Sequence, residues 1–310
     1  MTRLTWIVLS AGLSCLGAGC GSDGGDGAGT DPGTDAGTDT DADTDADTDS
    51  DSETDSEDLP PDEIGRAGRF TDVIEVDGIE RGYTLYVPES AVDAMADGPV
   101  PVLFALHGAG DTGSNFTSAT GLEDTADANA FVLFGPWALD AVWFEQPDEG
   151  WLGDDGYGSS LQNDLQLVLD LIAMASESYW LDHDMFYAVG HSRGAGFTGL
   201  TAILTGGYEI SSGVWESPFA AYCVNAGFQA MSGVDLAAVE SKRPVWIIHG
   251  TADSVVPYSM GNSFYEDLDA AGWDVTFTPV SGAGHTWLFQ SALGQTNQDL
   301  WDWFAANAIP

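Results

Sequence analysis

The sequence predicts an α/β domain in which a mostly parallel sheet is covered by helices on both faces. Two observations point to this class: continuous apolar runs recur from residue 70 onward, and stretches with helical spacing separate them. Strands that are buried on both faces carry continuous apolar runs, and parallel strands need crossover connections, which are usually helical. A chain of 310 residues, 44% of them hydrophobic, has the apolar material for one sizeable core.

The expected elements follow in chain order. An antiparallel hairpin opens the domain, with strands at Val73–Val76 and Tyr83–Val87 on either side of Asp77-Gly78. The later strands are expected at Val100–Leu106, Phe131–Gly135, Met185–Val189, Phe219–Val224, Val245–Ile248 and Val275–Val280. The helices are expected at Gly121–Asn129, Asp164–Ser176, Gly194–Leu204, Ser259–Ala271 and Thr296–Asn307.

The first 19 residues are typical of a signal peptide. Arg3 precedes the apolar stretch Leu4–Leu16, which is too short to span a membrane as a stable helix. The small residues before Cys20 resemble the bacterial lipobox, although Leu16 lies one place further from the cysteine than in its commonest form. We therefore expect lipidation at Cys20, an extracytoplasmic location and contact with a membrane through that anchor only. Simple secretion is the alternative.

Residues 20–63 form an acidic tract rich in Gly, Asp and Thr. The tract holds 17 acidic residues and no basic one. It cannot bury enough apolar surface to offset its ordering entropy, so we expect a disordered spacer before a catalytic domain at 64–310. Calcium binding is the alternative, but Asp39–Asp51 lacks the glycine turn and terminal glutamate of known calcium loops.

Charge and cysteine content exclude several classes of partner. The chain has 50 acidic and 7 basic residues, and residues 64–310 alone carry a net charge of −27. Such a surface repels phosphate backbones, so we expect no nucleic-acid partner, and anionic polymers are disfavoured as substrates. Three cysteines, one of them in the leader, cannot form a disulfide framework. We expect Cys223 to be a small core residue and the chain to be a monomer.

A candidate nucleophile lies in the motif Gly190-His-Ser-Arg-Gly194. The motif follows the apolar run Met185–Val189 and precedes a helix of small residues. This strand–turn–helix context is what a nucleophile elbow needs, because the flanking glycines let the helix pack close to the strand. We therefore expect Ser192 to be the nucleophile.

A serine hydroxyl needs a general base within hydrogen-bond reach. Four of the five histidines lie in the elbow, beside predicted strands or in a helix-to-strand loop, namely His107, His183, His191 and His249. The fifth, His285, lies in a glycine-rich loop after the last predicted strand, from which an imidazole can reach the serine. His285 is therefore the expected base.

The orienting acid is expected to be Asp253. It follows the predicted strand Val245–Ile248, and the resulting order Ser192, Asp253, His285 is the chain order of α/β-hydrolases. Glu216 is the alternative acid.

The oxyanion of an acyl-transfer intermediate needs backbone N–H donors. We expect one from Arg193, directly after the nucleophile, and one from Ala109 in the turn His107-Gly-Ala-Gly110 after a strand. The side chain of Arg193 could contact the substrate or a nearby acid, and the sequence does not decide between them. Three aromatic residues near the expected site are candidate substrate-binding residues, namely Trp143, Trp151 and Trp287; local packing is the alternative for all three.

Four motifs together resemble secreted esterases of the polyhydroxybutyrate-depolymerase-like and feruloyl-esterase-like family. They are Leu106-His-Gly108, the elbow, His249–Pro257 and Gly282–Trp287, and the likeness covers roughly Arg81–Phe304. The resemblance implies the α/β-hydrolase fold and ester hydrolysis through an acyl-enzyme, with no metal and no organic cofactor. Arg193 and Leu288 depart from residues common in that family, which affects the substrate subclass.

The sequence thus predicts a serine esterase. The expected substrates are neutral short-chain, aromatic (feruloyl-type), acetyl-polysaccharide or hydroxyalkanoate esters. A serine peptidase or acyltransferase on the same scaffold is one alternative, and a catalytically silent surface-binding lipoprotein is another.

Overall fold

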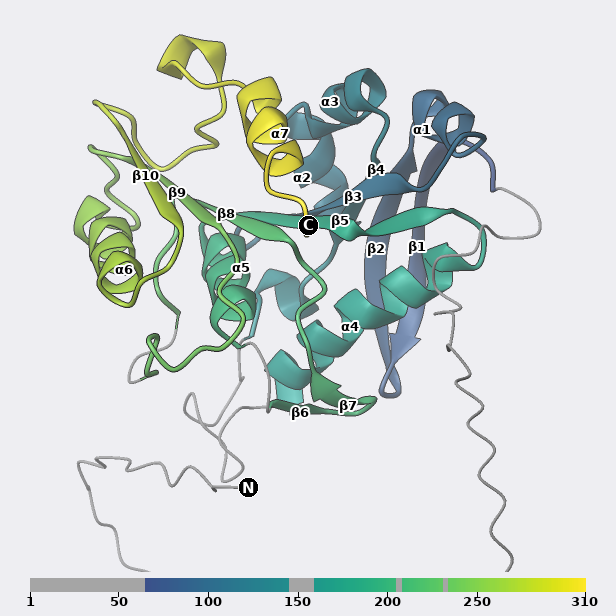
Figure 1. Ribbon diagram of the computed structural model, residues 1–310, viewed down its shortest axis with the longest axis horizontal. Coiled ribbons are helices and arrows are strands. Elements are labelled where there is room, and N and C mark those ends of the chain that lie inside the picture. Colours follow the sequence, from purple (N-terminus) through teal and green to yellow (C-terminus); the bar gives the residue numbers. More distant parts are fainter. Residues whose placement is uncertain (1–64, 145–158, 205–207, 231–233) are drawn as a thin grey trace, which may run out of the picture. The chain divides into compact units, whose positions relative to one another are not determined.

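The computed structural model describes residues 65–144, 159–204, 208–230 and 234–310. The expected signal peptide, Cys20, the acidic spacer and Trp151 lie outside these residues. Through the described part runs an eight-stranded sheet of order β1-β2-β4-β3-β5-β8-β9-β10 (Figure 1). Its strands are β1 (Gly68–Val76), β2 (Ile79–Val87), β3 (Val100–Leu106), β4 (Val132–Pro136), β5 (Leu181–His191), β8 (Ala221–Asn225), β9 (Val245–Gly250) and β10 (Val275–Val280).

The first two pairings of this sheet are antiparallel, and the others are parallel. β1 pairs with β2 around the turn at Asp77 and Gly78, and β2 pairs antiparallel with β4. From β4 through β3, β5, β8 and β9 to β10, every neighbouring pair is parallel. The predicted class, a mostly parallel sheet with an opening antiparallel hairpin, is confirmed. Parallel strands place their carboxyl ends at one edge, which is where open α/β sheets bind ligands.

Helices cover both faces of the sheet. In Figure 1, α2 (Gly113–Ala119), α3 (Leu122–Asn129) and α7 (Asn297–Ala305) lie above it. α4 (Ser159–Ser176), α5 (Arg193–Ile203) and α6 (Tyr258–Ala270) lie below it. The core accordingly has two layers. Along β3, Phe104 packs into the layer with α4 and α5, while Leu103 packs into the layer with α3 and α7. No helix in the described ranges is long and apolar enough to cross a bilayer.

The elements that the sequence did not predict are short. They are α1 (Glu89–Ala94), α2 and a small hairpin of β6 (Tyr208–Ile210) and β7 (Gly213–Trp215). The α2 sequence, Gly-Ser-Asn-Phe-Thr-Ser-Ala, contains mostly weak helix formers, so its helix depends on tertiary contacts. One such contact is backbone to backbone: a Cβ on Gly113 would lie 1.9 Å from the Gly135 carbonyl oxygen. Only glycine fits there.

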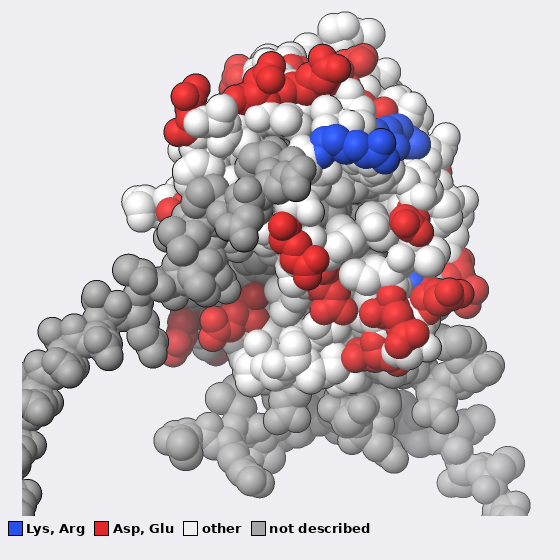
Figure 2. All heavy atoms as spheres, turned by 90° about the vertical axis from the view of Figure 1, so that its right-hand side faces the viewer, with Lys and Arg blue, Asp and Glu red and all other residues white. Residues whose placement is uncertain are grey.

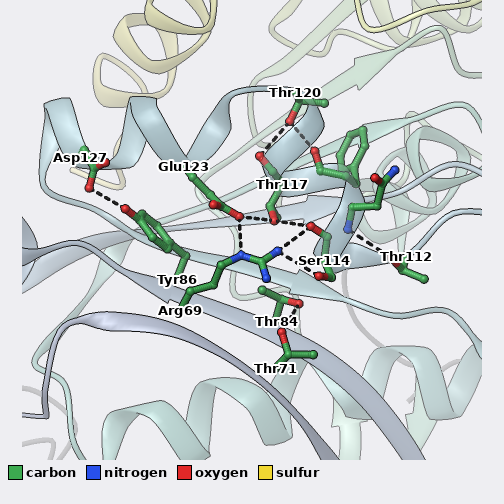
Figure 3. Close-up of polar contacts among 12 residues, drawn as sticks. Arg69, Thr71, Thr84, Tyr86, Thr112, Ser114, Thr117, Thr120, Glu123 and Asp127 are labelled. Carbon is green, nitrogen blue, oxygen red and sulfur yellow. Dashed lines mark hydrogen bonds and ion pairs between the residues drawn. The ribbon is translucent and has the colours of Figure 1, made fainter.

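Arg69 connects β1 to α2 and α3 (Figure 3). Its Nε donates to Glu123 Oε1 at 2.9 Å, and its Nη2 donates to the Ser114 carbonyl at 2.6 Å. Thr117 Oγ1 donates to the same carboxylate oxygen at 2.8 Å. The network fixes α2, which directly follows the glycine-rich turn after β3.

A buried ion pair connects the opening hairpin to α4. Arg81 on β2 lies 2.6 Å from Asp164 Oδ1, and neither side chain is exposed to solvent. The other oxygen of Asp164 accepts from the Phe144 N–H at 2.7 Å, and Arg81 also donates to the Trp137 carbonyl at 2.9 Å. Asn163 accepts a further bond from Arg81. The pair therefore holds both ends of the segment 137–144.

We expect Arg81→Met to lower the free energy of unfolding by about 3–5 kcal/mol, because it leaves the Asp164 carboxylate buried without its counter-charge. Urea denaturation followed by tryptophan fluorescence measures this change. The double variant Arg81→Met/Asp164→Leu should regain most of the loss, since no unpaired charge remains. As a control, Arg69→Met removes a partly exposed pair and should cost at most about 1 kcal/mol. Equal losses for Arg81→Met and Arg69→Met would contradict this assignment.

Candidate active site

Ser192 lies in a sharp turn between β5 and α5. Its backbone has φ 56° and ψ −117°, a region that residues with a side chain rarely adopt. The glycines on either side allow the turn. A Cβ on Gly190 would lie 2.2 Å from the Gly194 carbonyl oxygen, and one on Gly194 would lie 2.1 Å from the Leu106 carbonyl oxygen. The motif thus forms the elbow that its sequence context predicted.

The loops after β9 and β10 bring an acid and a base together. His285 Nδ1 lies 2.7 Å from Asp253 Oδ2. The other oxygen of Asp253 accepts from the N–H groups of Val255 and Val256, each at 2.9 Å. Burial alone would raise the pKa of Asp253, but the hydrogen bonds from His285 and from these two N–H groups outweigh it and lower that pKa. The ionised carboxylate can only accept, so His285 donates through Nδ1 and keeps Nε2 as the basic nitrogen.

The two loops are also joined through their backbones. The Ala252 N–H donates to the Ala283 carbonyl at 2.9 Å, and the Thr251 N–H donates to the Val280 carbonyl at 2.9 Å. Gly250 permits this approach, because a Cβ there would lie 2.3 Å from the Ala283 oxygen. Asp253 and His285 are therefore placed as one unit at the carboxyl edge of the sheet.

The base lies beside the elbow. The ring centroids of His285 and His191 are 4.8 Å apart, and His191 immediately precedes Ser192. On its other side, His191 stacks on Phe116 at 6.4 Å. Burial, which is the larger cause, and the neighbouring His285, which is the second, lower the pKa of His191 to about 4. This ring is therefore neutral at neutral pH. A neutral ring does not oppose the positive charge that a general base acquires.

The turn after β3 touches the nucleophile. A Cβ on Gly108 would lie 3.3 Å from Ser192 Cβ. The Gly110 N–H donates to the Ala141 carbonyl at 2.8 Å. The N–H of the exposed Ala109 has no acceptor in the described ranges. Arg193 begins α5 directly after Ser192. Arg193 thus follows Ser192 directly, and Ala109 follows Gly108, which lies against Ser192. The role of their N–H groups as oxyanion donors stays a prediction.

His107 supports this turn through both of its ring nitrogens. Its Nε2 accepts from the Ala138 N–H at 3.1 Å, so Nδ1 carries the proton and donates to the Gly108 carbonyl at 2.7 Å. Burial lowers its pKa, which keeps this tautomer uncharged. The ring is completely buried.

The Arg193 side chain packs on the segment 137–144. Its guanidinium carbon lies 4.1 Å from the Phe144 ring centroid, and its Nε donates to the Trp143 carbonyl at 3.1 Å. Sequence alone left the role of this side chain open. The structure shows a cation–π contact that ties the start of α5 to this segment.

The predicted substrate-binding role does not fit Trp143 or Trp287. Trp143 is fully buried, lies parallel to Phe197 at 5.0 Å, and donates through Nε1 to the His107 carbonyl at 2.8 Å. Trp287 is 8% exposed, lies edge-on to Phe116 and donates through Nε1 to Asn297 at 2.9 Å. Both rings find their partners in the core, which corrects the expectation that they form walls for a substrate. Trp151 lies outside the described residues.

Two further placements bear on the site. Glu216, the alternative acid, is exposed beyond β7, while His285 bonds to Asp253. Asn225, which the sequence reading passed over, ends β8 beside the elbow and is fully buried. The signal that could have revealed it is an amide at the end of an otherwise apolar run. Among the described residues, no group of three or more His, Cys, Asp or Glu side chains is arranged to hold a metal ion.

Known proteins resemble this chain in part of its sequence and in its fold. Residues 208–308 match the prolyl oligopeptidase family of peptidases. Acyl-protein thioesterase 1 of Neurospora crassa is 28% identical over 224 residues, which cover 64% of this chain and 85% of that protein.

Among solved structures, a thermostable esterase matches with a TM-score of 0.57 and 19% identity, over 77% of this chain and 63% of its own. Esterase PE8 matches with a TM-score of 0.52 and 21% identity, over 70% and 95%. The native Est2 esterase of Thermogutta terrifontis matches with a TM-score of 0.56 and 15% identity, over 77% of this chain and 91% of its own. The chain has the α/β-hydrolase fold and is similar to esterases and a thioesterase. The narrower resemblance to polyhydroxybutyrate depolymerases and feruloyl esterases stays a prediction.

We expect His191 to make folding stability depend on pH. The pKa of His191 is about 4 in the folded chain and near 6.5 when unfolded, so between these values only the unfolded state binds the proton. Stability is therefore fully present above about pH 6.5 and is lost as pH falls toward 4, by about 2 kcal/mol at pH 4.5. Urea denaturation at pH 7 and 4.5 measures it. Between pH 7 and 4.5, the free energy of unfolding should fall less in His191→Gln and in His191→Phe than in the wild-type protein. Equal falls in all three proteins would refute the assignment.

Proposed function

We propose that this chain hydrolyses carboxylic esters through a covalent acyl-enzyme on Ser192. The observation that carries the proposal is the hydrogen-bonded pair of Asp253 and His285 beside a strained nucleophile elbow. A strained serine, a base with a defined tautomer and an ionised acid are the parts that nucleophilic acyl transfer requires. The similarity to esterases and to a thioesterase supports the same reaction class.

In the proposed reaction, Ser192 Oγ attacks the ester carbonyl while His285 Nε2 takes the hydroxyl proton. Asp253 stabilises the resulting imidazolium through Nδ1–H. The N–H groups of Ala109 and Arg193 donate to the oxyanion. His285 then gives the proton to the leaving alkoxide, and an alcohol departs. Water, deprotonated by the same histidine, attacks the acyl-enzyme, and the acid product leaves with Ser192 restored.

Charge supports neutral esters as the substrate class. Residues 64–310 carry a net charge of −27, and Figure 2 shows Asp and Glu side chains spread over much of the face that it presents. A negatively charged ester must approach against this potential, and a neutral ester does not. Because Trp143 and Trp287 are buried, stacking on them gives no support to aromatic esters in particular. A hydrolysis screen over short acyl, feruloyl, acetyl-xylan and hydroxybutyrate esters would identify the acyl and alcohol groups that the site accepts.

A peptidase is the second candidate, favoured by one observation. The match to the prolyl oligopeptidase family, over residues 208–308, includes both Asp253 and His285. The two candidates use the same triad and differ in the leaving group. Comparing p-nitrophenyl esters with peptide p-nitroanilides separates them, and faster turnover of the anilides would favour the peptidase.

Replacing the nucleophile or the base should abolish turnover. We expect Ser192→Ala and His285→Ala each to lower kcat on a p-nitrophenyl ester by about 10⁴-fold or more, and the double variant to be little worse than either alone, because the two groups act as a unit. A fluorophosphonate probe should label the unchanged chain and not Ser192→Ala. Near-normal activity in Ser192→Ala would overturn the proposal.

Neutral esters should be hydrolysed better than matched carboxylate-bearing esters. The difference in kcat/KM should narrow as ionic strength rises, because salt screens the repulsion. Arg193→Ala tests the local alternative, in which the cation beside the nucleophile attracts an anionic substrate. Since Phe144 and the Trp143 carbonyl hold that guanidinium, we expect the variant to keep the preference for the neutral ester. A preference for the anionic ester that disappears in Arg193→Ala would refute the charge argument.

A further inference from the structure

Asn225 lies on β8, between β5, which leads to Ser192, and β9, which leads to Asp253. It is the last residue of β8, paired in register with His191 on β5 and with Ile248 on β9. It is completely buried. A fully buried amide at the end of a strand must satisfy several hydrogen-bonding groups locally, since each unsatisfied one costs about 1–3 kcal/mol.

The groups that Asn225 satisfies belong to the elbow and to the histidine loop. Its carbonyl accepts from the Ser192 N–H at 3.1 Å. Its side-chain Oδ1 accepts from the Leu288 N–H at 3.3 Å, and its Nδ2 donates to the Thr286 carbonyl at 3.5 Å. Asn225 therefore contacts Ser192 through its backbone, and Thr286 and Leu288, which follow His285, through its side chain.

The two side-chain contacts need an amide. The Leu288 N–H can only donate and the Thr286 carbonyl can only accept, so one short side chain must present an acceptor and a donor together. A carboxylate offers no donor, and an aliphatic side chain of similar size offers neither group. The contacts are long, so their own energies are small. Their effect is on geometry, because they hold the backbone of Thr286 and Leu288, directly after His285.

We propose that Asn225 is a positioning residue that sets the distance between His285 and Ser192, by holding the Ser192 N–H and the backbone of Thr286 and Leu288, which follow His285. This inference rests on the proposed hydrolysis at Ser192. Asp253 fixes the ring of His285 through Nδ1, and backbone bonds join the loop of His285 to the loop after β9. The contacts of Asn225 add a connection from this loop to β8, the strand next to β5. A displacement of about 1 Å at a reacting group can cost about 100-fold in rate.

The test compares three variants. Asn225→Leu keeps the approximate volume and removes both side-chain contacts. Asn225→Asp keeps the acceptor for Leu288 and places a second acceptor against the Thr286 carbonyl. Cys223→Ala is the matched control, because Cys223 is fully buried two residues earlier on the same strand and packs on the same face of the sheet as Trp287.

We expect kcat on a p-nitrophenyl ester to fall by about 100-fold in Asn225→Leu and by about 10-fold or more in Asn225→Asp. KM should stay within about threefold, since substrate contacts are unchanged. Cys223→Ala should keep kcat within about threefold. A kcat within about twofold of normal in Asn225→Leu, or an equal loss in Cys223→Ala, would overturn the inference.

A measurement without turnover separates this inference from the proposed reaction. Crystal structures of the variants give the separation of His285 Nε2 from Ser192 Oγ directly. It should increase in Asn225→Leu and stay the same in Cys223→Ala. If the wild-type protein hydrolyses no ester, the proposed function fails, and this separation still decides whether Asn225 positions His285. An unchanged separation in Asn225→Leu contradicts the inference.

Discussion

The backbone of Ser192 has a conformation that costs a non-glycine residue about 1–3 kcal/mol, and the surrounding structure is arranged to hold it there. Gly190 and Gly194 leave room for the turn on either side, and the Asn225 carbonyl accepts the serine N–H. Further residues with positive φ lie nearby. Asp140, Ala141 and Phe144 belong to the segment against Arg193, and Ala226 follows Asn225. Five of the seven described non-glycine residues with positive φ thus lie in or near the elbow, and the other two, Asp77 and Ala130, lie in turns elsewhere.

The fold could be predicted from the sequence because most of its parallel strands are buried on both faces. Val100–Leu106 is such an apolar run, and the structure gives it the predicted bounds. Val275–Val280 also has the predicted bounds, although it is a partly exposed edge strand. The short helix α2 could not be predicted in this way. Its sequence has little helical preference, and contacts with residues distant in the chain hold it in place.

The candidate site divides along a similar line. The sequence could bring Ser192, Asp253 and His285 together as a candidate triad because each follows a strand, and strand ends meet at one edge of a parallel sheet. The structure pairs Asp253 with His285, and the catalytic roles stay predictions. The aromatic residues could not be assigned, since burial depends on distant partners. Trp143 is covered by Phe197 of α5, and nothing in the local sequence indicates that contact. Asn225 was passed over because its role requires knowing that β8 lies between β5 and β9.

The buried pair of Arg81 and Asp164 links the opening hairpin to the nucleophile through a series of direct contacts. Asp164 holds the Phe144 backbone, and Phe144 packs on the guanidinium of Arg193, next to Ser192. A hairpin with no catalytic residue is therefore part of the framework of the site. A shortened catalytic fragment that started at β3 would keep every residue of the triad and still lose the support beneath the first turn of α5. A fragment that keeps this framework therefore begins before Arg81, more than 100 residues ahead of Ser192.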